Sequence, residues 1–218
     1  MVSAEDAEAF VREHSGLAPV AYVPEVRTYQ ADDAMALWER TEERDGAPGV
    51  APPFWAFPWA GGQALARYVI DHPAVVAGRN VLDIAAGSGL VGLAASVAGA
   101  ATVVANEIDP YAIAAIRLNA AANRRAIRTY QGNLVGGDGD VRADVVLAGD
   151  VFYNQDMAAA MLAFFQAARA RGADVLVGDP GRAYVPFDDL DVVTTFYVPV
   201  IRDLEDMDVK PTMVWRVR

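Results

Sequence analysis

Val81-Leu82-Asp83-Ile84-Ala85-Ala86-Gly87-Ser88-Gly89-Leu90-Val91-Gly92 is the most informative run of this sequence. An apolar segment with one carboxylate inside it is followed by small residues and then by apolar residues at helical spacing. This order predicts a strand, a tight turn and a helix. A turn of small residues lets a ligand approach the backbone at the carboxyl end of a strand. The run therefore predicts the ligand site of an α/β domain.

Outward from this run, short apolar segments alternate with longer helical ones. This alternation is typical of an α/β fold built on a mostly parallel sheet. The last two β-rich segments have no long helix between them, so they predict an antiparallel pair at one edge of the sheet. The pattern predicts helices at 62–71, 90–98, 110–123 and 155–171, and strands at 80–85, 101–106, 127–130, 144–148, 174–177, 192–198 and 213–217.

The first 50 residues differ in pattern from the rest of the chain. We expect helices at 4–13 and 32–43 and a strand at 26–29. The stretch 47–58 holds four prolines, which exclude a regular helix there. The sequence therefore predicts two parts, an N-terminal extension over 1–50 and the domain that carries the site over 51–218.

Composition excludes several classes of function. The 218 residues include 18 basic and 29 acidic side chains, for a net charge of −11, which disfavours nucleic acid and anionic membranes as partners. No cysteine is present, and the two histidines stand in no cluster, so we expect no metal site. The N-terminus has acids at Glu5, Asp6 and Glu8 and no signal-like apolar core, which predicts a cytoplasmic protein.

The glycine spacing by itself fits two classes of ligand. Gly87, Gly89 and Gly92 match the dinucleotide fingerprint, and Glu107 follows Gly87 by 107 − 87 = 20 residues, where it could accept ribose hydroxyls. An NAD-dependent oxidoreductase is therefore one interpretation. Asp83 argues against it, because a carboxylate beside the turn repels a pyrophosphate and suits a cationic ligand. S-adenosylmethionine carries an ammonium and a sulfonium and no phosphate.

Each of these residues also has a purely structural interpretation. Asp83 could cap amides of the turn, the glycines could serve tight packing of helix on strand, and Glu107 could belong to a helix start. All three explanations would have to hold together for the run to carry no ligand.

The run resembles the class I, seven-β-strand S-adenosylmethionine methyltransferases. Their pattern is hydrophobic-x-Asp-x-Gly-x-Gly-x-Gly, followed by an acid at the end of the second strand. Ala85 stands here in place of the first glycine. The resemblance implies a Rossmann-like seven-stranded sheet with an antiparallel edge strand and helices on both faces, and S-adenosyl-L-methionine as cofactor. It implies cofactor contacts at Asp83, Ala85, Ala86, Gly87, Ser88, Gly89 and Glu107.

Two further segments sharpen the resemblance. They are Pro52-Pro53-Phe54-Trp55-Ala56-Phe57-Pro58-Trp59-Ala60-Gly61-Gly62-Gln63-Ala64-Leu65-Ala66-Arg67-Tyr68 and Gly149-Asp150-Val151-Phe152-Tyr153. Both resemble the lysine-methyltransferase branch, and most of all the electron-transfer flavoprotein β-subunit lysine methyltransferases, from about residue 23 to the C-terminus. The resemblance implies a monomeric protein-lysine N-methyltransferase whose partner is that β subunit.

The motif after the fourth strand of the domain supplies the candidate catalytic residues. By resemblance, Asp150 orients the substrate amine and Tyr153 forms a wall of the lysine channel. Phe152 is expected to add an apolar side to the channel or to pack in the core. Trp55 is expected to line the approach for the substrate or to pack.

Three more residues are expected at the cofactor. Trp59 would lie against it, and Gly149 would stand beside it at the end of a strand. Asn133 occupies a position where this fold places a polar residue near the adenine, although Gly132 equally indicates a turn.

Other functions stay open from the sequence. A methyltransferase of this kind could act on another protein, such as a ribosomal one, or on a small amine such as nicotinamide. The Asn-Pro-Pro-Tyr type of motif is absent, which weighs against glutamine, adenine and cytosine as targets. From other classes, the NAD-dependent oxidoreductase and a non-catalytic binding module remain.

Overall fold

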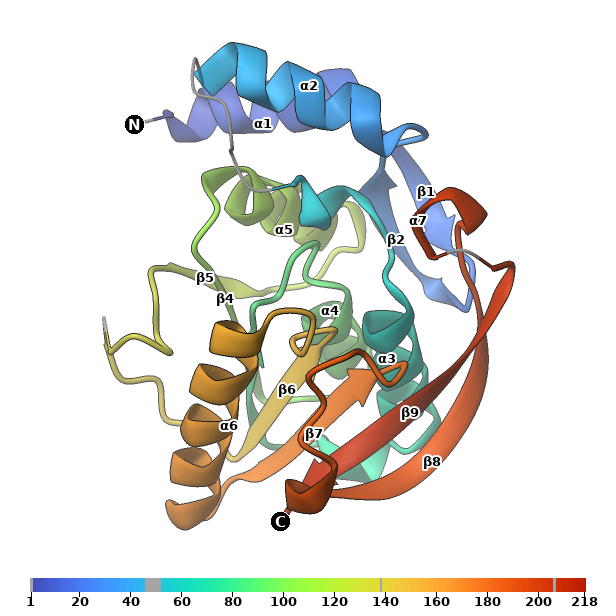
Figure 1. Cartoon of the computed structure of the whole chain (residues 1–218). Helices are drawn as coiled ribbons and strands as arrows, with labels where there is room; N and C mark the ends of the chain where they lie inside the picture. The colour runs from blue at the N-terminus through green and yellow to red at the C-terminus, as the bar shows by residue number, and fades with distance from the viewer. Residues whose placement is uncertain (1, 46–51, 138, 206) are drawn as a thin grey trace.

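The protein was examined as a computed structural model, which describes residues 2–45, 52–137, 139–205 and 207–218. In these residues one seven-stranded sheet has the order β5-β4-β3-β6-β7-β9-β8 (Figure 1). The strands β3 to β7 pair in parallel, and β9 is antiparallel to both β7 and β8. The predicted parallel sheet with an antiparallel edge pair is therefore confirmed. The strands are β3 (Asn80–Ile84), β4 (Thr102–Glu107), β5 (Arg128–Gln131), β6 (Val145–Gly149), β7 (Asp174–Asp179), β8 (Leu190–Pro199) and β9 (Val209–Val217).

Helices cover both faces of this sheet, as predicted. The central strands are nearly continuous apolar runs, as expected of a sheet that buries both of its faces. Val81 and Leu147 pack with α3 (Ala60–Asp71) and α4 (Leu90–Val97). Ala105 packs with α5 (Pro110–Ala122) on that same face. Leu82 and its neighbours pack on the opposite face with α6 (Gln155–Ala170). Figure 1 shows α6 and α3 on different sides of the sheet.

The N-terminal segment forms an additional layer over α5. It consists of α1 (Ala4–His14), a hairpin of β1 (Gly16–Val20) and β2 (Val23–Gln30), and α2 (Ala34–Asp45). Phe10 of α1 packs against Tyr111 of α5, with 4.9 Å between ring centroids. The strand predicted at 26–29 is the centre of β2. The boundary predicted at residues 50 and 51 lies outside the described residues.

Two elements were missing from the sequence-based prediction. β1 contains Pro19, and proline favours a turn over a strand unless the strand lies at an edge, as it does in this two-stranded hairpin. The short helix α7 (Arg202–Glu205) follows β8 and is too brief to show a helical period. β1 is held by its neighbour β2, and α7 is held by the ion pair of Glu205 with the distant Arg182.

Asn119 of α5 joins the N-terminal segment to the glycine-rich turn. It is fully buried, its Oδ1 accepts the backbone N–H of Tyr29 at 2.8 Å, and its Nδ2 donates to the carbonyl of Ser88 at 2.8 Å. Buried polar groups that lose a partner cost about 1–3 kcal/mol. The side chain therefore couples the layer over α5 to the turn after β3.

We expect Asn119→Ala to lower the free energy of unfolding by about 1–3 kcal/mol, because it orphans a buried N–H and a buried carbonyl. Urea denaturation measures the loss. Asn123→Ala is the matched control, since Asn123 makes the corresponding bond to Arg27 in a more exposed place. Equal losses in the two variants would contradict the argument from burial.

Candidate active site

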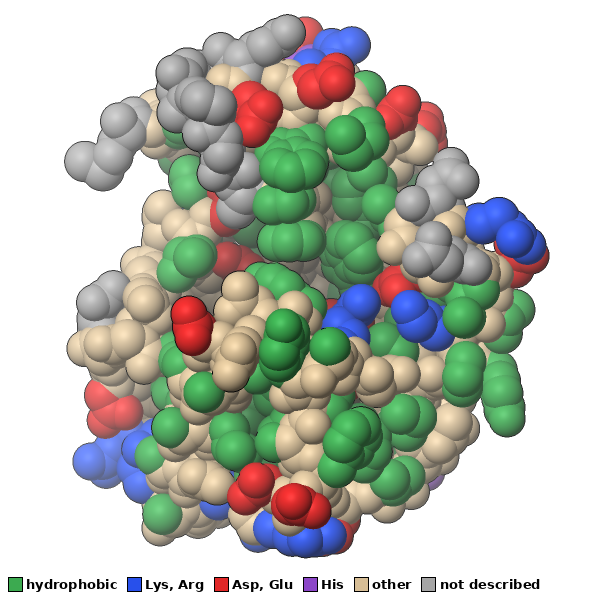
Figure 2. Space-filling view, in the orientation of Figure 1, with side chains coloured by type: hydrophobic (Ala, Val, Ile, Leu, Met, Phe, Trp, Pro, Cys, Tyr) green, Lys and Arg blue, Asp and Glu red, His purple; other side chains and the backbone are tan. Residues whose placement is uncertain are grey.

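A cavity of about 700 Å³ opens at the carboxyl ends of β3, β4 and β6. Its volume lies within the usual range for sites that bind small ligands. Figure 2 shows the hollow between the N-terminal layer and the sheet. The structure brings twelve of the sequence-predicted site residues to its wall: Trp55, Trp59, Asp83, Ala85, Ala86, Gly87, Ser88, Glu107, Asn133, Gly149, Asp150 and Tyr153.

Two predicted site residues do not line the cavity. Gly89 is the N-cap of α4 with φ 76°, and a Cβ there would lie 3.1 Å from Ile116. It serves the turn and the packing on α5 rather than a ligand contact. Phe152 is fully buried and packs against Phe165, with 6.4 Å between ring centroids. The expectation that Phe152 forms a side of the channel is corrected, because its ring faces the core under α6.

The turn after β3 is left-handed at two residues of the cavity wall. Ala85 has φ 52° and Gly87 has φ 53°. Alanine in this region costs about 1–2 kcal/mol, which explains the glycine that the family pattern has at the position of Ala85. The turn is held by the bond from the Ala86 N–H to the Asn106 carbonyl at 3.0 Å. Its backbone is therefore exposed to the cavity in a fixed shape.

Asp83 stands under this turn as a buried carboxyl group. Its Oδ2 accepts the backbone N–H of Gly92 at 2.7 Å, so it does bond a helix amide as the structural interpretation expected. Burial raises the pKa of Asp83 to about 8, with the Gly92 bond acting in the opposite direction. Because Asp83 also lines the cavity, a cationic ligand group beside it would stabilise the charged form.

We expect Asp83 to make the free protein less stable as pH rises. The pKa of an aspartate in the unfolded chain is about 3.9, below the folded value, so the folded state binds the proton more tightly. The stabilisation from the protonated form is complete below pH about 4 and is lost as pH rises through about 8. Asp83→Asn should therefore flatten the fall in unfolding free energy between pH 5 and pH 8. Urea midpoints measured across this range test it, and parallel curves for both proteins would contradict it.

Glu107 ends β4 and faces the turn. Its Oε1 accepts the N–H of Gly87 at 3.1 Å, and its Oε2 accepts the N–H of Ile108 at 2.8 Å. Burial raises its pKa, while these backbone bonds lower it. The carboxylate is thus fixed on the cavity wall with acceptor capacity left for hydroxyl groups. Asn133 also lies on the wall, where its Oδ1 accepts the N–H of Gly136 at 2.8 Å in the turn that the glycines indicated.

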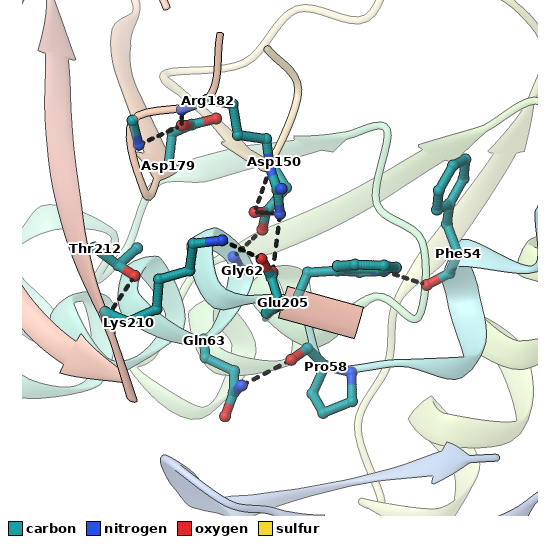
Figure 3. Close-up of polar contacts among 12 residues, drawn as sticks. Phe54, Pro58, Gly62, Gln63, Asp150, Asp179, Arg182, Glu205, Lys210 and Thr212 are labelled. Carbon is teal, nitrogen blue, oxygen red and sulfur yellow. Dashed lines mark hydrogen bonds and ion pairs between the residues drawn. The ribbon is translucent and has the colours of Figure 1, made fainter. Parts of the chain in front are cut away.

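Asp150 follows β6 and has a left-handed backbone, with φ 56°. Its backbone N–H donates to the Gly178 carbonyl at 2.9 Å, which fixes its direction. Its Oδ2 accepts the Gly62 N–H at 2.8 Å, and its Oδ1 accepts Nη2 of Arg182 at 2.8 Å (Figure 3). Burial raises the pKa of Asp150 to about 6, and Arg182 is the largest influence that lowers it.

Asp150 and the start of α3 lie close together because three glycines leave room there: Gly61, Gly149 and Gly178. A Cβ on Gly61 would lie 2.1 Å from the Gly178 carbonyl oxygen and 2.6 Å from Oδ2 of Asp150. A Cβ on Gly149 would lie 2.8 Å from Cα of Gly62. The first turn of α3 therefore packs directly on the ends of β6 and β7, where its free N–H groups meet the Asp150 carboxylate.

Aromatic rings form the outer part of the cavity. Tyr153 is 45% exposed, and its ring centroid lies 5.5 Å from that of Phe54. Trp59 lies 5.9 Å from Phe54, and its indole N–H donates to the Phe54 carbonyl at 2.9 Å. Burial raises the pKa of Tyr153, so its hydroxyl is neutral near pH 7. Trp55 is buried in the cluster with the N-terminal segment and also reaches the cavity wall, so its packing is confirmed while its contact with a substrate stays a prediction.

Sequence reasoning missed two residues of this site. Phe54 stands between Pro53 and Trp55, and no local feature of the sequence distinguishes its ring from those of the neighbouring tryptophans. Arg182 closes the segment Gly178-Asp179-Pro180-Gly181-Arg182 after β7, and a glycine-rich loop after a strand was the available signal. Its role was hidden because its partners Asp150 and Glu205 are 32 and 23 residues away in sequence.

No group of three or more His, Cys, Asp and Glu side chains in the described part of the chain is arranged to hold a metal ion. No helix among these residues is long and apolar enough to cross a membrane.

Comparison with known proteins identifies methyltransferases. A family model described as ribosomal protein L11 methyltransferase (PrmA) matches residues 63–151, the part that holds Asp83 and Glu107. The chain resembles T. thermophilus 16S rRNA N2 G1207 methyltransferase, solved with AdoMet and guanosine, with a TM-score of 0.59 and 16% identity over 94% of this chain and 50% of that one. It resembles a ribosomal protein L11 methylase of Lactobacillus delbrueckii with a TM-score of 0.51 and 20% identity over 72% of this chain and 78% of that one. At these identities the likeness establishes the fold alone.

Several sequence relatives are more similar to this chain than these structures are, and those that it matches over half or more of its length share one name. Electron transfer flavoprotein beta subunit lysine methyltransferase of Xenopus laevis is 36% identical over 183 residues, which are 83% of this chain and 73% of that protein. The protein of that name in Danio rerio is 38% identical, over 75% of this chain and 66% of that protein. In Homo sapiens the identity is 42%, over 60% of this chain and 50% of that protein. The matched part therefore spans between half and three quarters of these relatives.

Proposed function

The chain belongs to the family of electron transfer flavoprotein beta subunit lysine methyltransferases, and we propose that it transfers methyl groups from S-adenosyl-L-methionine to lysine side chains of that β subunit. The family resemblance indicated by the motifs is confirmed by relatives at 36–42% identity. One observation carries the proposal. A single cavity joins the acidic turn at Asp83 and Glu107 to an aromatic mouth at Tyr153, with Asp150 between β6 and α3.

The donor groups of the cavity fit this cofactor. Among the described residues on its wall are five carboxylates and one guanidinium: Asp83, Glu107, Asp109, Asp150, Asp156 and Arg182. Such a wall favours a ligand with an ammonium and a sulfonium and opposes the two phosphates of NAD. When bound, S-adenosylmethionine supplies the methyl carbon, and the electron pair of its C–S bond stays on sulfur as the lysine nitrogen forms the new C–N bond. Asp83 and the turn would hold its methionine part, and Glu107 its ribose.

The remaining residues would prepare the lysine. The amine must lose its proton to water before it can attack, although the pKa of lysine in water is about 10.4. Phe54, Trp59 and Tyr153 offer a partly apolar passage that desolvates the ammonium and lowers its pKa. Asp150 lines the end of this passage, where a free lone pair of its carboxylate orients the amine by accepting an N–H. Alignment with the methyl group then supplies most of the rate.

A second candidate has one observation in its favour. The L11 methyltransferase family model matches residues 63–151. An enzyme that methylates a ribosomal protein would therefore share the part of the site that is proposed to bind the cofactor. The aromatic mouth lies largely outside that match, since Phe54, Trp59 and Tyr153 fall before residue 63 or after residue 151. We therefore place the β subunit first.

A cytoplasmic location, a monomeric state and the absence of nucleic-acid and membrane partners stay predictions.

Intact mass spectrometry tests the proposal. Purified electron transfer flavoprotein from the same organism is incubated with the protein and S-adenosylmethionine, beside ribosomal protein L11. We expect mass increments of whole methyl groups on the β subunit and none on L11. Increments on L11 alone would replace the proposed substrate, and transfer to neither protein would reject both.

A further inference from the structure

Arg182 lies at the meeting point of the cavity and the antiparallel edge of the sheet. Its Nη2 donates to Oδ1 of Asp150 at 2.8 Å and to Oε1 of Glu205 at 3.0 Å. Its Nε makes a further bond to Oδ1 of Asp150 at 3.2 Å. Its guanidinium carbon lies 5.8 Å from the ring centroid of Trp59 (Figure 3 shows the polar contacts). The guanidinium therefore touches a carboxylate and an aromatic ring that both face the proposed substrate.

The loop that carries Arg182 is fixed by a buried carboxylate. Asp179 ends β7, and its Oδ1 accepts the N–H groups of Gly181 and Arg182, both at 2.8 Å. The side chain of Arg182 is 20% exposed and that of Asp150 is 10% exposed. Two buried groups that meet on rigid elements keep one geometry, which is what a positioned reactive group needs.

Charges alternate along this network. Asp150 pairs with Arg182, Arg182 pairs with Glu205, and Glu205 pairs with Lys210 of β9. Asp179 adds a fifth charge, and it raises the pKa of Asp150 where Arg182 lowers it. Tyr153 lines the cavity from the loop after β6, and Glu107 lines it from the end of β4. Arg182 is the cation of this set that contacts Asp150 directly.

The negative charge of Asp150 opposes deprotonation of the substrate lysine. A carboxylate beside an ammonium favours the charged form and holds the proton on the amine. The reaction needs the amine without that proton. The guanidinium of Arg182 already pairs with the Asp150 carboxylate before the substrate arrives. The carboxylate therefore stabilises the ammonium form of the substrate less, and raises the pKa of the amine less.

We propose that Arg182 is a positioning residue, which holds the Asp150 carboxylate in place and offsets its charge so that the substrate amine gives up its proton near neutral pH. This inference rests on the proposed function for its substrate. The contacts of Arg182 with Asp150 and Trp59 carry it. Without the guanidinium, the Asp150 carboxylate would take up a proton more readily in the free protein, and in the complex its counter-ion would be the substrate ammonium.

The first test needs no substrate. The protein is labelled with ¹³C in the aspartate carboxyl groups, loaded with S-adenosylhomocysteine, and titrated by NMR, with Asp150→Asn assigning the Asp150 signal. We expect this signal to titrate at clearly higher pH in Arg182→Gln than in the unaltered protein, and at a nearly unchanged pH in Arg182→Lys. An unchanged titration in Arg182→Gln overturns the inference.

The second test follows methyl transfer to the β subunit with pH. We expect kcat of Arg182→Gln to fall about tenfold at pH 7, as an amine pKa higher by one requires, and to approach the unaltered value at high pH. Arg182→Lys should keep the pH profile of the unaltered protein. Arg79→Gln is the matched control, because Arg79 forms a comparable ion pair with Asp174 away from the cavity.

The outcomes separate the inference from the proposed function. A rate that falls equally at every pH in Arg182→Gln, with S-adenosylhomocysteine still bound, would show a structural role only and overturn the inference. No transfer by the unaltered protein would reject the proposed substrate instead. In that case the carboxyl titration still decides whether Arg182 controls the charge of Asp150.

Discussion

Asp150→Asn is expected to lower the rate of methyl transfer by about 10²-fold, because misplacing a reacting group by about 1 Å has this effect. Asparagine tolerates the left-handed backbone that Asp150 adopts, so the fold around it should persist. Its amide oxygen can still accept the Gly62 N–H, while its NH₂ group meets the guanidinium of Arg182 with no charge to pair. The side chain then rotates or shifts away from the amine.

Two measurements make this prediction specific. S-adenosylhomocysteine binding, followed by calorimetry, should stay within a few-fold of the unaltered protein, because Asp83 and Glu107 are untouched. Asp174→Asn is the matched control. Asp174 also pairs with an arginine, but it lies at the start of β7, whereas Asp150 contacts the other end of that strand. Full activity in Asp150→Asn would remove Asp150 from the reaction. Lost cofactor binding would make its role structural.

Gly61→Ala should strongly destabilise the fold around the site. The added Cβ would lie 2.1 Å from the Gly178 carbonyl oxygen, which no side-chain rotation relieves. Overpacking of this kind costs about 1–3 kcal/mol or more. In a chain of this size each kcal/mol lowers Tm by about 2–4 °C. The helix start would also move from Oδ2 of Asp150, which lies 2.6 Å from the same Cβ, so methyl transfer should fall too.

The neighbouring glycine provides the control for this prediction. A Cβ on Gly62 would meet nothing within 4 Å, and alanine suits a helix better than glycine by up to about 1 kcal/mol. Gly62→Ala should therefore keep or raise Tm. Calorimetric unfolding of both variants decides the matter. A Tm for Gly61→Ala equal to that of Gly62→Ala would show that α3 can retreat from the sheet without cost.

Most of the fold followed from local pattern. The central strands are continuous apolar runs because both faces of the sheet are covered, and such runs are visible in any window of the sequence. The helices α4 and α5 begin where small or capping residues precede an apolar period, as at Asp109, whose Oδ1 accepts the N–H of Tyr111. Strand β1 was not predicted, because Pro19 within it favours a turn and its partner strand β2 only becomes visible as a partner once the hairpin has formed.

The residues of the site also fall into two groups, those that the local sequence indicates and those that only packing assigns. Asp83, Glu107 and Asp150 could be found from the sequence, because each ends a strand or interrupts one, and the carboxyl ends of parallel strands meet at one edge. For Phe152 the sequence left two places open, a side of the channel or the core, and only its packing with α6 decides between them.

The sequence by itself thus determined the sheet, the turn after β3 and the acidic residues around it, because apolar period, small residues and strand ends are properties of neighbouring positions. The tertiary structure alone placed Arg182 on Asp150, Asn119 on the turn, and Gly61 against Gly178. These contacts join residues between 31 and 117 positions apart, the last being 178 − 61, and nothing local in the chain encodes them. Their energies depend on burial, which exists only once the layers have packed.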